Sequence, residues 1–394
     1  MYIHASVFIT RQPLPLPANP AILPEDLEDW MDADILVIGG GIAGISAAAR
    51  LAPHGHVVLV EAEPALAYHA SGRSAALYEP QYGLAPVVGL SLASGGFFRA
   101  DPLLLKLRGL MILGKADQTA SFEALCDELG VAPIPFDEAR AQVPILSPVT
   151  VALVATGAHA WDIDTDLLIQ GFARELRAHR GEIRLKSPVT AITRTAAGWR
   201  LTAGGRDITA GILVNAAGAW ADKVAAMAGI KPIGLQPYRR SMARIPAPGG
   251  HDVSRWPMLF GAAASPDQEE SWYAKPDAGA LIVSPAEEFS MEPHDAFAED
   301  MVLAEGLARY EEMVTEPVTR LITSWAGLRT FAPDRVLVLG PDPVDPAFVW
   351  SAGQGGYGFQ TSPAASQLVA DAVLGRVPAL EPGLVAALSP GRFR

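Results

Sequence analysis

Three short segments of the chain consist almost entirely of β-branched residues and leucine, a composition typical of strands buried on both faces of a sheet. They occupy residues 34–38, 57–60 and 213–214. A glycine-rich turn follows the first segment, and the alanine-rich residues 45–51 after it predict a helix. The first two segments therefore predict a strand–helix–strand unit.

Other stretches alternate between helical and strand periodicity. Residues 165–180 place their apolar side chains on one stripe, which predicts an amphipathic helix. Gly204-Gly205 lies between two strand-like segments and predicts a hairpin. Further strands are predicted at 183–185, 189–193, 199–202, 336–339 and 348–351, and further helices at about 298–314 and 362–374.

Signals of a nucleotide-binding fold occur near the start of the chain, at residues 213–218 and at the end, whereas the intervening segments have a different pattern. This order predicts an α/β protein with a discontinuous Rossmann-like domain. The insertions are expected to form a second, α+β domain with a mixed or antiparallel sheet. We assign residues 31–83, 162–237 and 326–394 to the first domain, and residues 84–161 and 238–325 to the second.

Composition restricts the functions that the chain can have. Its 394 residues carry a net charge of −13, which argues against nucleic-acid binding because nothing offsets the repulsion from phosphate. No apolar run reaches the roughly 18 residues needed to span a bilayer. The proline-rich residues 1–30 lack the apolar stretch of a secretory signal and are expected to be a disordered extension. We expect a cytoplasmic protein, either free or peripheral to the inner membrane.

Two other features exclude metal and disulfide chemistry. Cys126 is the only cysteine, so the chain has no internal disulfide and no thiolate metal cage. Asp162, Asp164 and Asp166 are spaced like calcium ligands, but Leu167 and Ala173 hold the positions where such a loop needs glycine and glutamate. We therefore expect no metal, and an aspartate at this helix start satisfies free N–H groups instead.

The turn after the first strand has the spacing Gly39-x-Gly41-x-x-Gly44 of a dinucleotide-binding fingerprint. The first glycine permits the tight turn, the second lets a pyrophosphate approach the backbone, and the third lets the helix pack on the strand. Glu61 ends the second strand, where a carboxylate binds a ribose hydroxyl. NAD and FAD both use this fingerprint. The late strands and the small polar loop at residues 69–74 favour FAD.

Eight motifs occur in a fixed order along the chain: residues 37–44, 68–76, 162–166, 213–220, 234–241, 256–259, 325–329 and 354–358. Together they resemble the FAD-dependent D-amino-acid oxidase (DAO) family, which includes glycine oxidase, sarcosine oxidase and bacterial D-amino-acid dehydrogenases. The match looks closest to the catabolic D-arginine dehydrogenases.

The resemblance implies a glutathione-reductase-type FAD domain. FAD is expected to be non-covalent, because relatives that attach it covalently use a cysteine near Trp325, where this chain has none. The flavin takes hydride from the substrate Cα without a strong protein base, so no catalytic base is assigned. His69 is expected to contact the flavin. The implied cofactor-binding residues are Gly39, Gly41, Ile42, Ala43, Gly44, Glu61, Ala62, His69, Gly72, Arg73, Ser74, Ala75, Val189, Gly218, Gln354, Gly355, Gly356, Tyr357, Gly358 and Phe359.

A D-amino acid presents a carboxylate, an amine and a Cα–H bond, and arginine binds carboxylates through paired, charge-assisted N–H bonds. By resemblance, Arg329 and Arg240 bind this carboxylate. The hydroxyls of Tyr82 and Tyr273 bond the same group, and the backbone carbonyl of Gly356 accepts the ammonium.

Two pairs of residues bear on substrate binding: two adjacent arginines, and two leucines that differ from the residues of D-arginine dehydrogenases. Neighbouring strand residues point to opposite faces, so only one of Arg239 and Arg240 should face the site, and the resemblance selects Arg240. Leu77 and Leu110 stand where D-arginine dehydrogenases have a histidine and a carboxylate. A cationic side chain without a partner is costly in an apolar pocket. The pocket is therefore expected to prefer a neutral or apolar D-amino acid, unless Glu79 or another acid reaches it.

Three functions remain open. The first is an FAD-dependent D-amino-acid dehydrogenase that gives an imino acid, which hydrolyses to a 2-oxo acid and ammonia, with a quinone or an electron-transfer protein as acceptor. The second is an oxidase of glycine or sarcosine. Oxygen use in the sarcosine enzymes is linked to a lysine beside the flavin, and residues 280–282, where it would fall, contain none. The third is a non-catalytic or tRNA-modifying FAD protein, against which the acidic charge argues.

Overall fold

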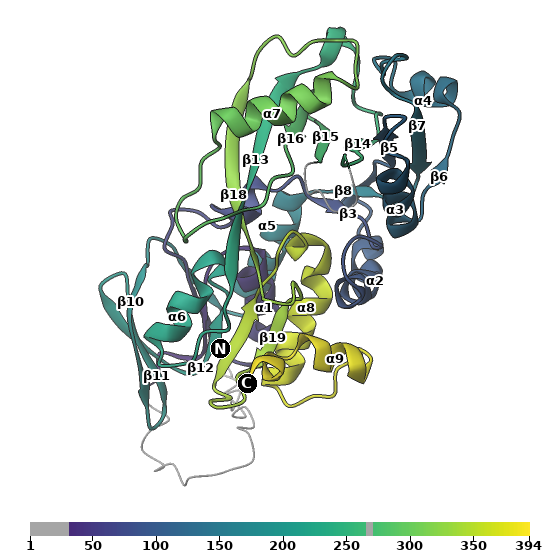
Figure 1. Ribbon diagram of the computed structural model, residues 1–394. Helices are drawn as coiled ribbons and strands as arrows, with labels where there is room; N and C mark the ends of the chain where they lie inside the picture. Colours follow the sequence, from purple (N-terminus) through teal and green to yellow (C-terminus); the bar gives the residue numbers. More distant parts are fainter. Residues whose placement is uncertain (1–30, 265–270) are drawn as a thin grey trace, which may run out of the picture.

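The computed structural model describes residues 31–264 and 271–394, so the extension expected at residues 1–30 lies outside the described residues. Two large sheets, each with its own helices, form the lower and upper parts of the molecule in Figure 1. The expected α/β fold with mixed sheets is confirmed. No helix among the described residues combines the length and apolar character needed to cross a membrane.

The lower sheet is built on parallel strands in the order β9-β2-β1-β12-β20. The hairpin predicted at Gly204-Gly205 joins β11 to the first half of β12, and β19 pairs antiparallel with β20. The strands are β1 (Ala33–Ile38), β2 (Val57–Val60), β9 (Glu182–Arg184), β10 (Val189–Thr195), β11 (Gly198–Ala203), β12 (Arg206–Asn215), β19 (Val338–Pro341) and β20 (Phe348–Ala352).

Helices cover both faces of this sheet because its strands are apolar on both sides. In β1, Ile35 and Val37 pack into one core with α1, α5 and α8, whereas Leu36 and Ile38 pack into the other with α6. Asp164 caps α5 by accepting the N–H of Leu167, as expected of an aspartate at this helix start. The helices are α1 (Ile42–Leu51), α5 (Thr165–Ala178), α6 (Ala221–Met227), α8 (Gly358–Val373) and α9 (Pro382–Leu388).

The strands of the upper sheet pair in the order β17-β13-β16-β15-β14-β5-β7-β6, and β18 also pairs with β13. Most pairs are antiparallel, and β5 and β14 form a parallel pair. Helix α7 (Asp300–Glu311) covers one face, and α3 (Thr119–Leu129) and α4 (Phe136–Gln142) lie near β7. The strands are β5 (Leu110–Gly114), β6 (Ala132–Pro133), β7 (Leu153–Gly157), β13 (Gln236–Pro246), β14 (Met258–Gly261), β15 (Trp272–Asp277), β16 (Ala280–Ser284), β17 (Phe289–Ser290) and β18 (Thr323–Phe331).

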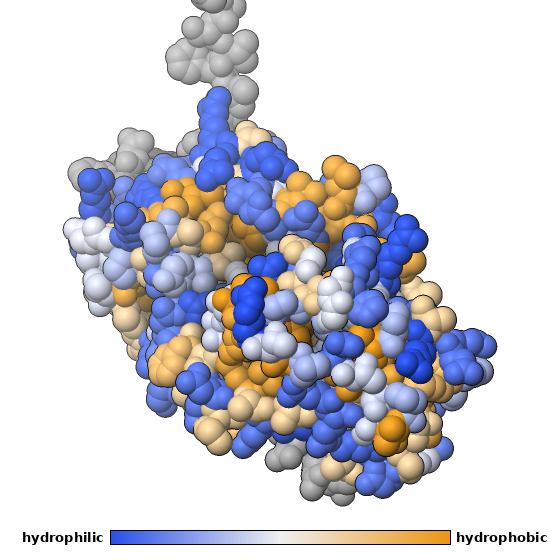
Figure 2. Space-filling model, turned by 90° about the horizontal axis from the view of Figure 1, so that it is seen from above, coloured by the Kyte–Doolittle hydropathy of each residue, from blue (hydrophilic) through white to orange (hydrophobic). Residues whose placement is uncertain are grey.

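The long strands β13 and β18 run from the upper part into the lower part (Figure 1), and a small sheet, β3-β8-β4, lies beside them. This sheet consists of β3 (Leu77–Tyr78), β8 (Trp161–Ile163) and β4 (Leu105–Leu107). Helix α2 (Ala85–Ala100) falls within the segment that we assigned to the second domain, but it packs on α8 in the core of the lower sheet. Figure 2 shows the upper end of the molecule covered mainly by hydrophilic residues, with separate hydrophobic patches.

Candidate functional site

A cavity of about 490 Å³ opens at the carboxyl ends of β1, β2 and β12. This is where open α/β sheets bind nucleotides, because the helices that follow the strands direct their N-termini there. The cavity also extends to Gly327 and Leu328 in β18, so it reaches from the lower sheet to the upper one. Eight residues predicted to bind the cofactor line it: Gly39, Gly41, Glu61, Ala62, His69, Arg73, Val189 and Gly218.

Two of the fingerprint glycines occupy positions where a side chain has no room, and the third has little. Gly39 has φ +108°, and a Cβ there would overlap the carbonyl oxygen of Ala216. A Cβ on Gly44 would overlap the carbonyl oxygen of Gly39, so this glycine lets α1 pack against the turn. A Cβ on Gly41 would lie 3.2 Å from the hydroxyl of Ser71, at the wall of the cavity. The turn therefore exposes backbone to a ligand in the cavity.

Glu61 follows β2 and joins the two loops at the cavity wall. Its Oε2 accepts the N–H of Gly40 at 2.6 Å, and its Oε1 accepts the N–H of Glu63 at 2.9 Å. The carboxylate thus shapes the fingerprint turn as well as lining the cavity, where it can accept further bonds from ribose hydroxyls.

The loop before α7 contributes His294 and Ala296 to the cavity wall, and Arg73 holds it there. The guanidinium of Arg73 donates to the carbonyls of Ala296 and Ala326 and to the carboxylate of Asp295. Because the guanidinium of Arg73 bonds these protein groups, it ties the loop to β18 rather than offering a free charge to a ligand. His69 bonds Glu63 at 3.0 Å, and its ring lies 4.8 Å from that of Trp220.

The other predicted cofactor residues lie outside the lining of this cavity. Ile42, Ala43 and Gly44 belong to α1, and a Cβ on Gly358 would lie 3.2 Å from Ile42. The N-termini of α1 and α8 therefore meet, and both concentrate free N–H groups at the same place. The remaining residues outside the lining are Gly72, Ser74, Ala75, Gln354, Gly355, Gly356, Tyr357, Gly358 and Phe359.

These features fit a flavin dinucleotide. The side-chain-free turn can hold a pyrophosphate, Glu61 can hold a ribose, and the cavity continues toward β18. Cys126 lies in α3, buried in a separate apolar cluster, and burial raises the pKa of its thiol to about 11. Non-covalent attachment stays a prediction.

The predicted substrate residues lie together beside β18. Tyr238 of β13 is directly opposite Arg329 of β18, so Arg240, two residues further on, shares the face of Arg329. A Cβ on Gly356 would lie 3.0 Å from Nη1 of Arg329, which places this glycine against the guanidinium. Tyr82 and Tyr273 interact electrostatically with both arginines.

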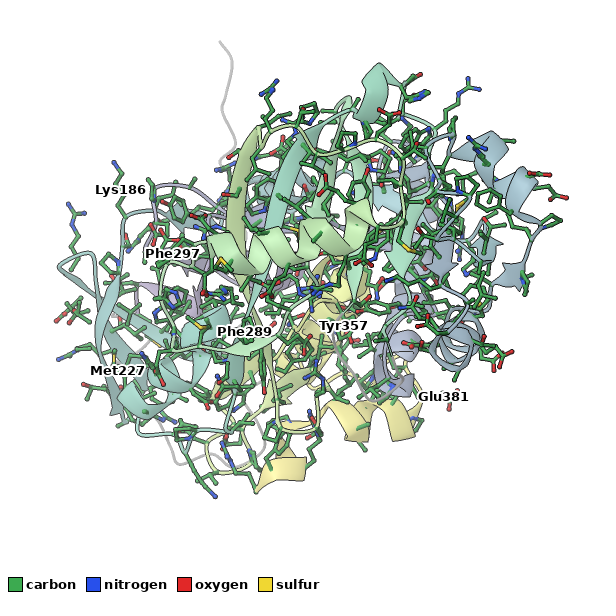
Figure 3. All side chains as sticks on the ribbon, turned by 45° about the horizontal axis from the view of Figure 1, so that its top comes forward. Lys186, Met227, Phe289, Phe297, Tyr357 and Glu381 are labelled. Atoms are coloured by element: carbon green, nitrogen blue, oxygen red, sulfur yellow. The ribbon has the colours of Figure 1, made fainter. Side chains whose placement is uncertain are left out.

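Tyr357, which we predicted only as a cofactor residue, also belongs to this cluster. Its ring lies 5.4 Å from that of Tyr82, and its hydroxyl interacts with Arg329. Figure 3 shows its side chain near the middle of the view, below α7. The motif at residues 354–358 contained this residue, but the sequence did not indicate to which of the two sites it belongs.

The two arginines differ in their partners. The guanidinium of Arg329 has no hydrogen-bond or ion-pair partner among residues 31–264 and 271–394. Although burial opposes its charge, the neighbouring Tyr273, Tyr82 and Glu288 raise its pKa above the ordinary value. Arg240 instead donates to the carbonyl of Glu287 and to the carboxylate of Glu288. Burial, and then the charge of Arg329, lower the pKa of Arg240.

The two leucines expected at the substrate side chain lie in apolar surroundings. Leu110 is fully buried in β5, in a cluster with Ile112, Phe122 and Cys126. Leu77 is partly buried and packs against both this cluster and the one that contains Tyr273. Glu79 lies two residues after Leu77 and is buried. Its carboxylate accepts the N–H of Gln81 and lies 3.6 Å from His159, so it already has protein partners.

A buried ionic cluster was missed by the sequence analysis. Lys275 lies directly opposite Ile282 in the β15–β16 pair, and its ammonium donates to the carbonyls of Ala75 and Ala76 and contacts Asp162. Asp162 also pairs with Arg108. The sequence analysis found no lysine at residues 280–282, which belong to β16. The neighbouring strand β15 does carry one, Lys275, opposite Ile282. A lysine within an apolar strand was the signal that could have revealed it.

Several residues that line the cavity were also not predicted: Tyr68, Ser71, Trp220, Lys223, His294 and Ala296. Trp220 lies inside a motif that the sequence analysis quoted, so it could have been included. His294 and Ala296 come from the loop before α7, where the sequence offers no motif, and only the fold brings them to the cavity.

Several known proteins resemble this chain over most of its length. FAD-dependent oxidoreductase domain-containing protein 1 of Bos taurus is 24% identical over 410 residues, which cover 87% of this chain and 81% of the relative. In a second comparison, the L-proline dehydrogenase of P. horikoshii has the same fold, with a TM-score of 0.77 and 22% identity over 92% of this chain and 98% of that structure. Glycine oxidase of Geobacillus kaustophilus gives a TM-score of 0.74 and 21% identity, covering 91% and 98%.

The family assignment follows from a match over most of the chain. Residues 34–372 match the profile of the DAO family, described as FAD dependent oxidoreductase. This stretch contains the fingerprint turn, the cavity lining and the arginine cluster, so the features that make up the site lie inside the matching region. The chain belongs to the DAO family of FAD-dependent oxidoreductases.

Proposed function

We propose that this protein catalyses the FAD-dependent oxidative deamination of D-amino acids with neutral or apolar side chains, giving an imino acid that hydrolyses to a 2-oxo acid and ammonia. The observation that carries the proposal is the unpartnered guanidinium of Arg329, next to Tyr82, Tyr273 and Gly356. A partly buried arginine without a counter-ion is costly, and a substrate carboxylate would supply the missing charge.

Each protein group has a defined task in this proposal. Arg329 binds the carboxylate, the hydroxyls of Tyr82 and Tyr273 donate to the same group, and the carbonyl of Gly356 accepts a hydrogen bond from the substrate amine. Arg240, which the resemblance also assigned to the carboxylate, is left out of this role because Glu288 already pairs with it. FAD supplies the hydride acceptor for the Cα–H bond. No side chain is assigned as a base, because the amine enters the reaction in its neutral form. The preference for D-isomers rests on the sequence motifs.

The apolar surroundings of Leu77 and Leu110 support the choice of substrate side chain. Each buried methylene of a substrate contributes about 0.8 kcal/mol, whereas a guanidinium would be desolvated without a partner. We therefore expect D-Leu, D-Met or D-Phe to have a higher kcat/KM than D-Arg. A tenfold preference for D-Arg would contradict this assignment.

The experiment is anaerobic mixing of the purified holoenzyme with a panel of D- and L-amino acids, followed by the loss of flavin absorbance. Bleaching by apolar D-amino acids alone supports the proposal, and bleaching by none of the panel would overturn it. Reoxidation by oxygen, a quinone analogue or an artificial dye then identifies the class of electron acceptor.

A second candidate is oxidation of glycine or sarcosine with oxygen as acceptor. The position of Lys275 opposite Ile282 favours it, because a lysine near the flavin is linked to oxygen use in sarcosine enzymes. Glycine and sarcosine therefore belong in the same panel, with hydrogen peroxide formation as the readout. Rapid peroxide release with sarcosine would select this candidate over the first.

A further inference from the structure

Two neighbouring arginines of β13 are each paired with a glutamate, on opposite faces of the strand. Arg239 Nη2 lies 2.7 Å from Glu299 Oε2, and Arg240 Nη2 lies 3.1 Å from Glu288 Oε1. Successive side chains of a strand alternate between its faces, so the two ion pairs are separate. The register of β13 with β18 puts Arg240, but not Arg239, on the face of Arg329.

The carboxylate of Glu288 is held at both oxygens. Oε1 accepts from Arg240, and Oε2 accepts from Nη2 of Arg335 at 2.7 Å. Only 16% of the Glu288 side chain is exposed, and Arg335 is itself fixed over the ring of Phe331. Since both oxygens are used, the carboxylate has a defined orientation toward Arg240.

Among the described residues, this cluster contains the guanidinium groups of Arg240, Arg329 and Arg335 and the carboxylate of Glu288, and the carboxylate of Glu287 interacts with Arg240 from nearby. Arg240 and Arg335 both bond Glu288, while Arg329 remains unpartnered. Arg329 can bind a ligand carboxylate, whereas the charge of the neighbouring Arg240 is already balanced by Glu288. This arrangement favours a ligand with one carboxylate. A second carboxylate on the ligand would meet the negative charge of Glu288 instead of a free arginine.

We propose that Glu288 determines specificity by occupying the anion position on Arg240, so that the site accepts a single carboxylate on Arg329 and excludes dicarboxylic substrates. The inference rests on the proposed function, because it assumes that Arg329 binds the substrate carboxylate. It adds a residue that selects among substrates by charge, in addition to the apolar side-chain contacts. Glu288 acts by direct exclusion of a second anion and needs no conformational change.

The test measures ligand binding to the oxidised holoenzyme by perturbation of the flavin absorbance at pH 8, where the ligands are fully ionised. The probes are acetate and propionate as monocarboxylates, and malonate and succinate as dicarboxylates. In the wild type we expect the monocarboxylates to have Kd values at least tenfold lower. Glu288→Gln should lower this preference at least tenfold, because it frees Arg240 for the second carboxylate.

Glu299→Gln is the matched control. It also removes a carboxylate partner of a β13 arginine, but on the face away from Arg329, so the wild-type preference should persist. Arg239 keeps a second carboxylate, that of Glu287, at 3.8 Å. An equal change in both variants would mean that overall charge, and not Glu288, sets the preference. Equal tightening of mono- and dicarboxylates in Glu288→Gln would also overturn the proposal, because both arginines would then bind one carboxylate.

The double variant Arg240→Gln/Glu288→Gln addresses the possibility that the single variant does not fold. It replaces the buried Arg240–Glu288 pair by two neutral side chains, and Arg335, which also loses Glu288, has a side chain that is 43% exposed and can be solvated. Monocarboxylate binding on Arg329 should remain within threefold of wild type. Loss of this binding would show that Arg240 is the carboxylate clamp and would refute the inference.

Binding is measured without turnover, so the outcome is separate from that of the proposed function. If no amino acid reduces the flavin but the carboxylates bind as described, the role of Glu288 stands and the reaction must be reassigned. If amino acids are oxidised but Glu288→Gln leaves the binding preference unchanged, only the present inference fails.

Discussion

Arg329 is the residue on which the substrate site depends most directly. It lies in β18 beside Gly356, and its guanidinium forms no hydrogen bond or ion pair with any described residue. We expect Arg329→Gln to lower kcat/KM for every substrate by a factor equivalent to about 2–5 kcal/mol, because a charge-assisted bond to the carboxylate is lost. Steady-state kinetics with two substrates of different side chain test this, with the exposed Arg200→Gln as control. A loss confined to one substrate would mean that Arg329 contacts the side chain.

Glu79 is the clearest pH-sensitive group outside the arginine cluster. Burial raises its pKa to about 7, whereas a glutamate in an unfolded chain titrates near 4.3. The folded state therefore holds its proton more tightly, and stability falls as the pH rises through this window. Above about pH 7 the loss is complete.

Glu79→Gln keeps the shape of the side chain without its charge. We expect the variant to gain about 3 kcal/mol relative to wild type between pH 4.5 and pH 8, with the gain appearing as the pH rises. Denaturant unfolding at several pH values measures it, with Glu123→Gln as control for the loss of an exposed carboxylate. A difference that is independent of pH would contradict the assignment.

Helices α1 and α2 provide a matched pair of glycines at the scale of the element. A Cβ on Gly44 would overlap the carbonyl of Gly39, whereas a Cβ on Gly96 meets no atom within 4 Å. Gly44→Ala should therefore push α1 away from the fingerprint turn and reduce FAD retention. Gly96→Ala should stabilise the protein by about 0.5–1 kcal/mol, because alanine is the better helix former.

Thermal unfolding and the flavin content after gel filtration distinguish these two variants. The expected result is a flavin-poor, less stable Gly44→Ala and a flavin-replete, slightly more stable Gly96→Ala. Full flavin content in Gly44→Ala would show that the turn tolerates a displaced helix.

Asp162 links three elements through charge. It lies in β8, pairs with Lys275 of β15 and with Arg108 before β5, and both cations are at least nine-tenths buried. Asp162→Asn would leave two buried cations without their anion, which we expect to cost about 3–5 kcal/mol of unfolding free energy. Asp164→Asn is the control, because asparagine caps a helix as well as aspartate does. Equal, small effects would show that water replaces the lost partner.

At the scale of the whole molecule, the cofactor cavity connects the two sheets. Its lining runs from Glu61 after β2 to Leu328 in β18 and includes Ala296 from the loop before α7. A ligand that binds only this folded arrangement stabilises it according to its concentration and affinity. We expect removal of FAD to lower the Tm and its re-addition to restore it.

The same preparation tests the mode of attachment. Acid or heat should release intact FAD into the supernatant, because Cys126 lies in α3 away from the cavity and the chain has no other cysteine. Flavin that remains with the denatured chain would contradict non-covalent binding. Apoprotein with an unchanged Tm would contradict the coupling between cofactor and fold.

Local sequence patterns predict most strands of the lower sheet, the helix that follows its first strand and the cofactor turn. These features depend on short-range rules, since buried strands are β-branched and a turn against backbone atoms requires glycine. Helix α8 begins at Gly358, four residues before the predicted start, because a glycine-rich turn and a helix N-terminus have the same local composition.

Which charged side chains form pairs depends on the folding of distant segments against each other. The pairing of β13 with β18 places Arg240 beside Arg329, and the short strand β17 brings Glu288 to Arg240. Lys275 reaches Ala75 and Asp162 through contacts between residues more than 100 positions apart. Strand order and register fix such neighbours, and they depend on the packing of the whole chain, which no local pattern encodes.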